Sequence, residues 1–397
     1  MKLVDIFDRH WDAFAGARPY LLSAAHHRAA EAVRACRTAA LGAQVYECGP
    51  CRRRRLQYHS CHHRACTQCD KHKQQEWSQR QEAKLLDTGY YMLTFTLPAE
   101  LRDTCYKNQR WFYAILFDAV RDTLRALDLR HKRLVTDGAH NDQTAGFTAV
   151  LHTWTREMLY HPHIHVVMPG LSLVKGGQRI NRPARADYLM PHRAIAKRFK
   201  ILLRRKLVEH DAAEQRNDIS AIKQAAWDKR WVVDVKSVGN GRDSLRYLAR
   251  YVHRTAVSEE RMLGVTADGR LRLNCQNSRT RVWRELSLDP REFLRRWCLH
   301  VLPKGFTRVR HYGYLSAAAV EKLGQIRNIL QMPEPSTPLR APAVGPQCEC
   351  CKNPMKLMGT VTRHGQWMPA PSVLFELGLA ILQARRASAK TPLPDTG

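Results

Sequence analysis

The stretch HPHIHVVMPG (residues 161–170) has the pattern of a β-strand that carries two histidines. Residues i and i+2 of a strand project to the same face, so His163 and His165 point one way and the residue between them points the other. The stretch AGFTAVLHTW (residues 145–154) is a second strand candidate, and the short connection between the two predicts an antiparallel hairpin. On such a hairpin, His152 would lie across from the histidine pair.

Three imidazoles on this hairpin are a candidate metal site, with coordination positions left for a phosphate oxygen, as a catalytic metal requires. Taken alone, two histidines separated by one residue in a strand are more often surface or core residues than ligands. For His152, a role as third ligand and ordinary strand packing both stay open. Imidazole ligands suit zinc or manganese better than magnesium, so the spacing does not decide the metal.

Further strands and helices alternate around this hairpin. YYMLTFTLP (90–98) and WVVDVKSV (231–238) indicate strands, and residues 105–130 carry a helical pattern. MPHRAIAKRFKILLRRKLVEH (190–210) indicates an amphipathic helix whose polar side is strongly basic. Together these segments predict an α+β fold with a central antiparallel sheet and covering helices.

The charge of the chain indicates its class of partner. It has 65 Lys and Arg against 36 Asp and Glu, a formal charge of +29 over 397 residues. A field of this sign attracts polyanions, so nucleic acid is the first partner to consider. An anionic membrane is the rival, but VLFELGLAIL is too short to span a bilayer and contains Glu376. The first residues lack the apolar core of a signal peptide, so we expect a cytoplasmic protein without a membrane partner.

Six of the twelve cysteines lie between Cys36 and Cys69. Two C-x-x-C pairs with fourteen residues between them predict a tetrathiolate Zn²⁺ site, with buried reduced thiols as the alternative. The four predicted ligands are Cys48, Cys51, Cys66 and Cys69. Four arginines in the gap predict a DNA-binding loop, with a solvated charged loop as the alternative. They are Arg52, Arg53, Arg54 and Arg55.

These segments divide the chain into three predicted domains. Residues 1–88 form an N-terminal helical and zinc-binding domain, and residues 89–330 form the domain built on the histidine hairpin. Residues 331–397 form a linker and C-terminal tail, because MPEPSTPLRAPAVGP holds five prolines. The tail contains one further C-x-x-C pair, which does not by itself predict a metal site.

The stretch YLARYVHR (residues 247–254) places Tyr247 and Tyr251 one helical turn apart. On a helix, residues i and i+4 lie one above the other, about 5–6 Å apart at Cβ, and such a pair alone is usually packing. Beside a histidine metal site on a strongly basic chain, the pair indicates phosphodiester chemistry. A tyrosine can attack a phosphodiester and leave a covalent 5′-phosphotyrosine with a free 3′-hydroxyl.

The ordered set of motifs resembles the HUH rolling-circle transposases with two catalytic tyrosines, of the IS91-type insertion-sequence family. The resemblance covers about residues 15–318. It is carried by CRTAALG, the cysteine pairs, LHTW followed by HPHIHVVMPG, YLARYVHR and EFLRRWCLHVLPKGFTRVRHYGYL. It implies a sheet of the HUH-nuclease type and a metal-dependent enzyme that cleaves and rejoins single-stranded DNA through 5′-phosphotyrosine intermediates in rolling-circle transposition.

The resemblance also implies roles for residues and partners. His163 and His165 would bind Mg²⁺ or Mn²⁺, with His152 as the candidate third ligand, and Tyr247 and Tyr251 would be the nucleophiles. The N-terminal cysteine pairs would hold Zn²⁺. The implied partners are single-stranded element ends, target DNA and the host helicase and replication machinery, in the bacterial cytoplasm at the nucleoid.

Basic residues near these motifs are candidate DNA contacts. Arg250 shares the tyrosine helix, and Arg308 and Arg310 lie close to Tyr312 and Tyr314. Cations along a backbone and aromatic rings for bases suit single-stranded DNA. For Arg250 the alternative is simple solvation on the helix surface. For Arg308, Arg310 and the two tyrosines it is a strand-and-turn core with basic exposure.

The chain departs from the family pattern at two positions. Gln44 and Ala65 stand where relatives carry histidine. Our hypothesis is that both histidines belonged to a second zinc site with Cys36 and Cys61. That site would now be lost, or rebuilt with His62 or His63. Two other functions stay open: a plasmid or phage replication initiator or relaxase with the same chemistry, and a non-catalytic zinc-dependent DNA-binding regulator.

Overall fold

A computed structural model describes residues 1–17, 19–129, 133–134, 142–183, 185, 187–220, 222, 224–243, 245, 255–277, 280, 282–333 and 345–374; the side chains of residues 70–75 and 133 are also left undescribed. The chain forms two compact units. The large unit comprises Met1–Ala30 and Asp70–Pro338, and the small unit comprises Glu31–Cys69 and Leu339–Gly397. These units differ from the predicted boundaries, because part of the expected tail joins the cysteine-rich segment.

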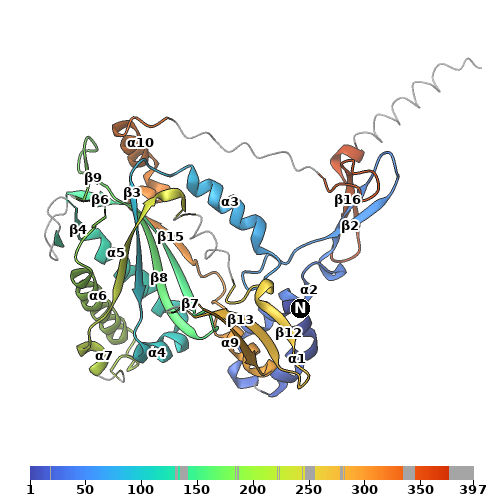
Figure 1. Ribbon diagram of the computed structural model, residues 1–397, viewed down its shortest axis with the longest axis horizontal. Helices are drawn as coiled ribbons and strands as arrows, with labels where there is room; N and C mark the ends of the chain where they lie inside the picture. Colours follow the sequence, from blue (N-terminus) through green and yellow to red (C-terminus); the bar gives the residue numbers. More distant parts are fainter. Residues whose placement is uncertain are drawn as a thin grey trace, which may run out of the picture. The chain divides into compact units, whose positions relative to one another are not determined.

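The large unit is built on a five-stranded sheet with the strand order β11-β3-β8-β7-β15 (Figure 1). All four pairings in this sheet are antiparallel, as the sequence predicted. The strands are β3 (Gly89–Thr96), β7 (Phe147–Trp154), β8 (Tyr160–Pro169), β11 (Val233–Asn240) and β15 (Val309–Tyr312). Strands β7 and β8 form the predicted hairpin at the centre.

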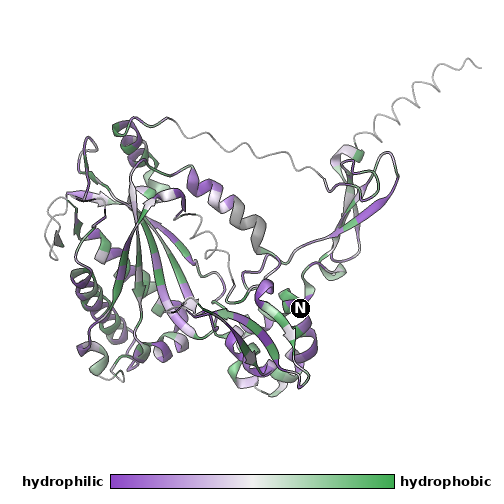
Figure 2. Cartoon of the chain, in the orientation of Figure 1, coloured by the Kyte–Doolittle hydropathy of each residue, from purple (hydrophilic) through white to green (hydrophobic). Residues whose placement is uncertain are grey.

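One face of this sheet forms the main apolar core. Ile164, Val166 and Met168 of β8 are fully buried there. The face is covered by α5 (Gln109–Arg125) and α6 (His192–Ala213), whose apolar sides pack on it. Figure 2 shows α6 with hydrophobic and hydrophilic residues alternating around the helix, as its sequence predicted.

The opposite face, here called the histidine face, carries His152, His163 and His165, because alternate residues of a strand project to opposite sides. A smaller apolar cluster lies on the same face and includes Trp77 of α3 (Asp70–Glu82). The buried members of this cluster are Trp77, Tyr90, Val150, Val167 and Leu245.

Smaller elements surround the sheet in the large unit. One of them is a three-stranded antiparallel sheet with the order β12-β13-β14. The bounds of these elements are α1 (Leu3–Ala17), α2 (Ala24–Ala35), α4 (Arg102–Lys107), β4 (Leu127–Asp128), β5 (Arg133–Leu134), β6 (Gln143–Ala145), β9 (Ser172–Val174), β10 (Ile180–Asn181), α7 (Ala225–Asp228), β12 (Met262–Val265), β13 (Leu271–Gln276), β14 (Trp283–Leu288), α9 (Pro290–Cys298) and α10 (Val320–Ile329).

The small unit contains a four-stranded antiparallel sheet with the order β17-β16-β1-β2. Its first hairpin is β1 (Ala43–Glu47) and β2 (Arg54–Tyr58), and its second is β16 (Lys356–Val361) and β17 (Trp367–Pro369). The two hairpins are joined where β1 pairs with β16. Among the described residues, no helix combines the length and the hydropathy needed to cross a membrane.

Candidate functional site

The β7–β8 hairpin brings the three predicted histidines together. His152 lies directly opposite His163, and Val150 lies opposite His165. A nitrogen from each of the three rings lies within 4.8 Å of a nitrogen of the other two. His152 is only 2% exposed. The predicted cluster therefore forms on rigid, hydrogen-bonded strands.

Hydrogen bonds orient two of these rings. The Nε2 atoms of His163 and His165 face each other at 3.1 Å. The Nδ1 atom of His163 lies 2.6 Å from the carbonyl oxygen of His161 and must donate to it, which makes Nε2 the lone-pair atom of that ring. The Nδ1 atom of His165 lies 3.1 Å from the hydroxyl of Thr94. Partners of this kind fix the tautomer and orientation of metal-binding histidines.

The electrostatics keep the rings neutral. Burial is the main cause that lowers the pKa of His152 and His163 well below the usual histidine value. Burial likewise lowers the pKa of His165 to about 4, and the nearby carboxylate of Asp234 opposes that change. Neutral imidazole is the form that binds a metal. The donor type, the neutral rings and the hydrogen bonds to the His161 carbonyl and the Thr94 hydroxyl all fit a divalent cation.

The tyrosine segment, with Tyr247, Tyr251 and Arg250, lies outside the described residues. Leu245, just before it, is buried in the apolar cluster on the histidine face, in the same group as Val150. Val150 is the residue opposite His165 in the hairpin. The chain therefore enters the tyrosine segment from the face that carries the histidines.

The two later arginines differ in their surroundings. The guanidinium of Arg308 lies 5.7 Å from the ring of Trp154 and is close enough to His152 to help lower its pKa. The guanidinium of Arg310 lies 4.3 Å from the ring of Phe117, on the core face of the sheet. Only Arg308 is therefore beside the histidine cluster.

Tyr314 is a core residue, so its predicted contact with bases is wrong. Its side chain is fully buried, and its hydroxyl donates to the carbonyl of Leu171 at 3.0 Å. The ring fills the space beside Gly146, where a Cβ atom would lie 2.4 Å from it. The alternative reading of this stretch, a strand-and-turn core, is correct for this residue.

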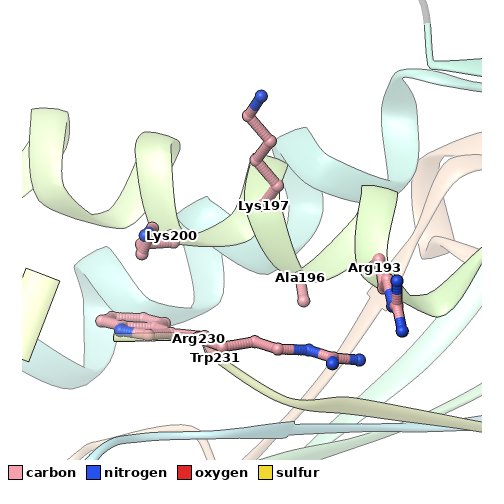
Figure 3. A pocket seen from close by; sticks show the side chains of 6 residues that line it. All are labelled: Arg193, Ala196, Lys197, Lys200, Arg230 and Trp231. Atoms are coloured by element: carbon pink, nitrogen blue, oxygen red, sulfur yellow. The ribbon is translucent and has the colours of Figure 1, made fainter. Parts of the chain in front are cut away.

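A cationic pocket of about 250 Å³ lies at the edge of the central sheet and was not predicted from the sequence. The pocket is lined by Arg193, Ala196, Lys197, Lys200, Arg230 and Trp231 (Figure 3). An adjoining hollow extends to Asp234 of the edge strand β11. Asp234 pairs with Thr94, and Thr94 pairs with His165, so two strand spacings, about 10 Å, separate Asp234 from His165. The available signal was the basic side of the amphipathic helix predicted at residues 190–210, to which no site was assigned.

The cysteines form two clusters, and the predicted grouping into one site is wrong. In each cluster the four sulfur atoms lie within 4.8 Å of one another. The first cluster is Cys36, Cys61, Cys66 and Cys69, and the second is Cys48, Cys51, Cys348 and Cys351. The reason is that Cys48 and Cys51 lie at the turn of the β1–β2 hairpin, whereas Cys66 and Cys69 follow the far end of β2. Five strand residues, about 16 Å, separate those ends.

The first cluster also corrects the hypothesis about lost histidines. It is complete with four thiols and includes neither His62 nor His63. Gln44 stands at one of the two positions where relatives carry histidine, and its side-chain oxygen accepts a hydrogen bond from the Tyr46 hydroxyl at 2.9 Å. In the second cluster, hydrogen bonds from the Asn353 backbone, and then from Cys51 and Cys48, lower the pKa of Cys351 to about 6.

The arginines near the β1–β2 turn belong to the small unit and are exposed. Glu47 forms ion pairs with Arg52 at 3.2 Å and with Arg54 at 2.9 Å. Arg55 lies 3.6 Å from Glu349. Arg53 completes the run, so part of the predicted positive charge is neutralised within the unit.

Comparisons with known proteins agree with these features. Residues 6–97 match the family described as "Transposase zinc-binding domain", and residues 146–322 match the family described as "Putative transposase". The chain is 33% identical over 354 residues to "Putative transposase y4qJ" of Sinorhizobium fredii, covering 84% of this chain and 85% of that protein.

A second relative is the transposase for insertion sequence element IS801 of Pseudomonas savastanoi pv. phaseolicola. It is 27% identical over 297 residues, covering 71% of this chain and 68% of that protein. No solved structure is significantly similar to the chain. From the zinc-binding and transposase regions and the extent of these similarities, we conclude that the chain belongs to the IS91-type family of DNA transposases.

Proposed function

We propose that this transposase cleaves and rejoins single-stranded DNA through 5′-phosphotyrosine intermediates, in the rolling-circle mode. The observation that carries the proposal is the cluster of three neutral imidazoles on the face from which the chain enters the tyrosine segment. Phosphodiester transesterification needs a metal-binding face and a tyrosine that can reach the phosphate held there, and the proposal is that Tyr247 and Tyr251 supply that tyrosine.

The divalent cation would be held by His152, His163 and His165. The His161 carbonyl and the Thr94 hydroxyl would keep the rings of His163 and His165 oriented. When bound, Mn²⁺ or Mg²⁺ would supply charge that polarises the scissile phosphate. An all-imidazole donor set favours Mn²⁺ over Mg²⁺ in binding. Arg308, beside His152, would add positive charge where the phosphate enters.

Tyr247 or Tyr251 would act as the nucleophile. The phenolic oxygen, after losing its proton, forms a bond to phosphorus, and the bond between phosphorus and the 3′ oxygen breaks. The products are a 5′-phosphotyrosine and a strand with a free 3′-hydroxyl. One phosphate ester bond breaks and another forms, so the number of ester bonds does not change. His253, which also lies outside the described residues, is our candidate proton acceptor.

The second tyrosine would allow strand transfer. While one tyrosine holds a DNA end, the other cleaves the target or the far end of the element. Each free 3′-hydroxyl then attacks a phosphotyrosine, which restores the phenol and joins the strands. A host helicase or replication machinery would supply the single-stranded DNA.

The DNA would follow the basic surfaces near the histidines. From Arg308 the strand would pass over the edge strand β11 to the cationic pocket, where Arg193 and Arg230 would contact phosphates. Strand β11 lies two strand spacings, about 10 Å, from the strand that carries His163 and His165, so the pocket would contact phosphates farther along the same DNA strand. Arg250 would contribute from the tyrosine segment and Arg52–Arg55 from the small unit.

The test is covalent trapping. The protein is incubated with single-stranded oligonucleotides of the element ends and Mn²⁺, and a denaturation-resistant protein–DNA adduct is sought. We expect an adduct from the wild type and from each single Tyr→Phe variant at positions 247 and 251, and none from the double variant, which still binds DNA. A zinc-dependent regulator would give no adduct at all. A replication initiator or relaxase would give the adduct, but would not join the strand to the ends of an insertion sequence.

A further inference from the structure

The second cysteine cluster joins residues that are far apart in the chain. The sulfur atoms of Cys48 and Cys351 lie 3.4 Å apart, although 303 positions separate the two residues. Cys348 and Cys351 lie outside both regions matched by the family descriptions, which are residues 6–97 and 146–322. The similarity to a zinc-binding domain therefore leaves half of this cluster unassigned.

Two turns of the same geometry supply the four thiols. In the first, the Cys48 N–H donates to the Arg53 carbonyl at 2.9 Å, and the Arg52 N–H donates to the Cys48 carbonyl at 2.8 Å. The second repeats this pattern: the Cys348 N–H donates to the Asn353 carbonyl at 2.8 Å, and the Lys352 N–H donates to the Cys348 carbonyl at 3.0 Å.

The backbone at the residue after each pair is also alike. Arg52 has a φ of 53° and Lys352 has a φ of 60°. A non-glycine residue in this left-handed region is uncommon, and both turns adopt it at the equivalent position. The turns therefore present their two sulfur atoms in the same way, as two halves of one site.

The sheet of the small unit holds the two turns together. The first turn connects β1 and β2, and the second precedes β16, which pairs with β1 over five register positions. Cys48 and Cys348 are buried with Met355 in an apolar cluster that Cys51 and Cys351 join at its side. Cys350, in the second turn, is exposed and is not one of the four clustered cysteines.

We propose that Cys48, Cys51, Cys348 and Cys351 form a tetrathiolate Zn²⁺ site that staples the C-terminal hairpin to the N-terminal one. Two C-x-x-C turns give four sulfurs in one cluster, which is the donor set of a structural zinc site. Closing a loop of some 300 residues costs conformational entropy, and metal binding can supply the free energy for this closure. This second zinc site would thus be assembled only after the segment around residue 350 is made, whereas the first cluster needs only residues up to Cys69.

The proposal is independent of the catalytic proposal, and its test is metal stoichiometry. Zinc per chain is measured by inductively coupled plasma mass spectrometry on the purified full-length wild type and on C348S/C351S. We expect two zinc ions in the wild type and one in the double variant. The matched control is C350S, which alters a cysteine of the same turn and should keep two zinc ions. Two ions in C348S/C351S, or loss of an ion in C350S instead, would overturn the assignment.

A spectroscopic variant covers the case in which removing two ligands unfolds the small unit. Cys348→His keeps a ligand at the position, so the variant should hold two metal ions. In the Co²⁺-substituted protein, the thiolate charge-transfer absorption should fall by about one eighth, from eight thiolates to seven. A spectrum identical to that of the wild type would show that Cys348 is not a ligand and would refute the proposal.

Discussion

The cationic pocket at the edge of β11 predicts a specific change in single-stranded DNA binding. Arg193 and Arg230 are exposed and line both hollows there, and the adjoining hollow reaches Asp234, which lies two strand spacings from His165. The perturbation is the double variant Arg193→Gln/Arg230→Gln, which removes two positive charges and keeps hydrogen-bonding side chains. We expect weaker binding with a smaller salt dependence.

The magnitude follows from counterion release. Each phosphate contact to a single strand contributes about 0.7 to the slope of log K against log salt concentration, so losing two contacts lowers the slope by about 1.4. Between 50 and 200 mM salt, a fourfold change, the wild type should therefore lose about sevenfold more affinity than the variant. Fluorescence anisotropy of a labelled single-stranded oligonucleotide measures both affinities.

The control removes the same number of positive charges, both of them from α6. Arg204→Gln/Arg205→Gln alters α6 outside the pocket, where Arg204 contacts Gln224 at 3.1 Å and Arg205 lies 3.7 Å from Glu209. We expect this control to change the slope by much less. Equal slopes for the two double variants would mean that only the net charge matters and would refute the role of the pocket.

Three further predictions concern single residues. Thr94→Val removes the hydroxyl beside His165 Nδ1 and should weaken Mn²⁺ binding about 10- to 100-fold without changing DNA affinity. Titration followed by electron paramagnetic resonance measures the Mn²⁺ affinity. An undiminished Mn²⁺ affinity would count against the histidine site. Burial lowers the pKa of His300 from 6.5 to about 4, so the unfolded state binds more protons between these values. The stabilisation from neutral His300 should therefore be complete above pH 6.5 and should be lost as the pH falls to 4, by at most about 3 kcal/mol. His300→Gln should make the unfolding temperature depend less on pH in this range. An unchanged pH dependence would contradict the lowered pKa of His300. Tyr314→Phe loses a buried hydrogen bond to Leu171 and should lower the free energy of unfolding in urea by about 1–3 kcal/mol without changing DNA affinity. Weaker DNA binding at unchanged stability would instead support a contact between Tyr314 and a base.

The histidine hairpin could be predicted from sequence because its determinants are local. Alternation along β8 fixes which face His163 and His165 occupy, and the short connection to β7 fixes the register that places His152 opposite. The orienting partner Thr94 could not be found in this way. Its strand is adjacent to β8 in the sheet but some 70 positions away in sequence.

The cysteine clusters show the same limit. The C-x-x-C spacing predicted that these cysteines belong to metal-type clusters. Which two C-x-x-C pairs share a cluster depends on the pairing of β1 with β16, and these strands meet only in the folded small unit. The five prolines before residue 347 led to the prediction of a linker and tail, although a β-hairpin of the small unit follows them. Tyr314 was misassigned because alternation of basic and aromatic residues also describes a strand end packed against Gly146.

The claim on which this account depends is that a tyrosine of residues 247–254 becomes covalently linked to a DNA 5′ phosphate. The most direct measurement is mass spectrometry of the trapped adduct after nuclease digestion and proteolysis. The account predicts a nucleotide attached through phosphate to the peptide that contains Tyr247 or Tyr251, formed only when the histidine cluster is intact. A nucleotide on any other residue, or an adduct that forms equally well in His163→Ala/His165→Ala, would contradict it.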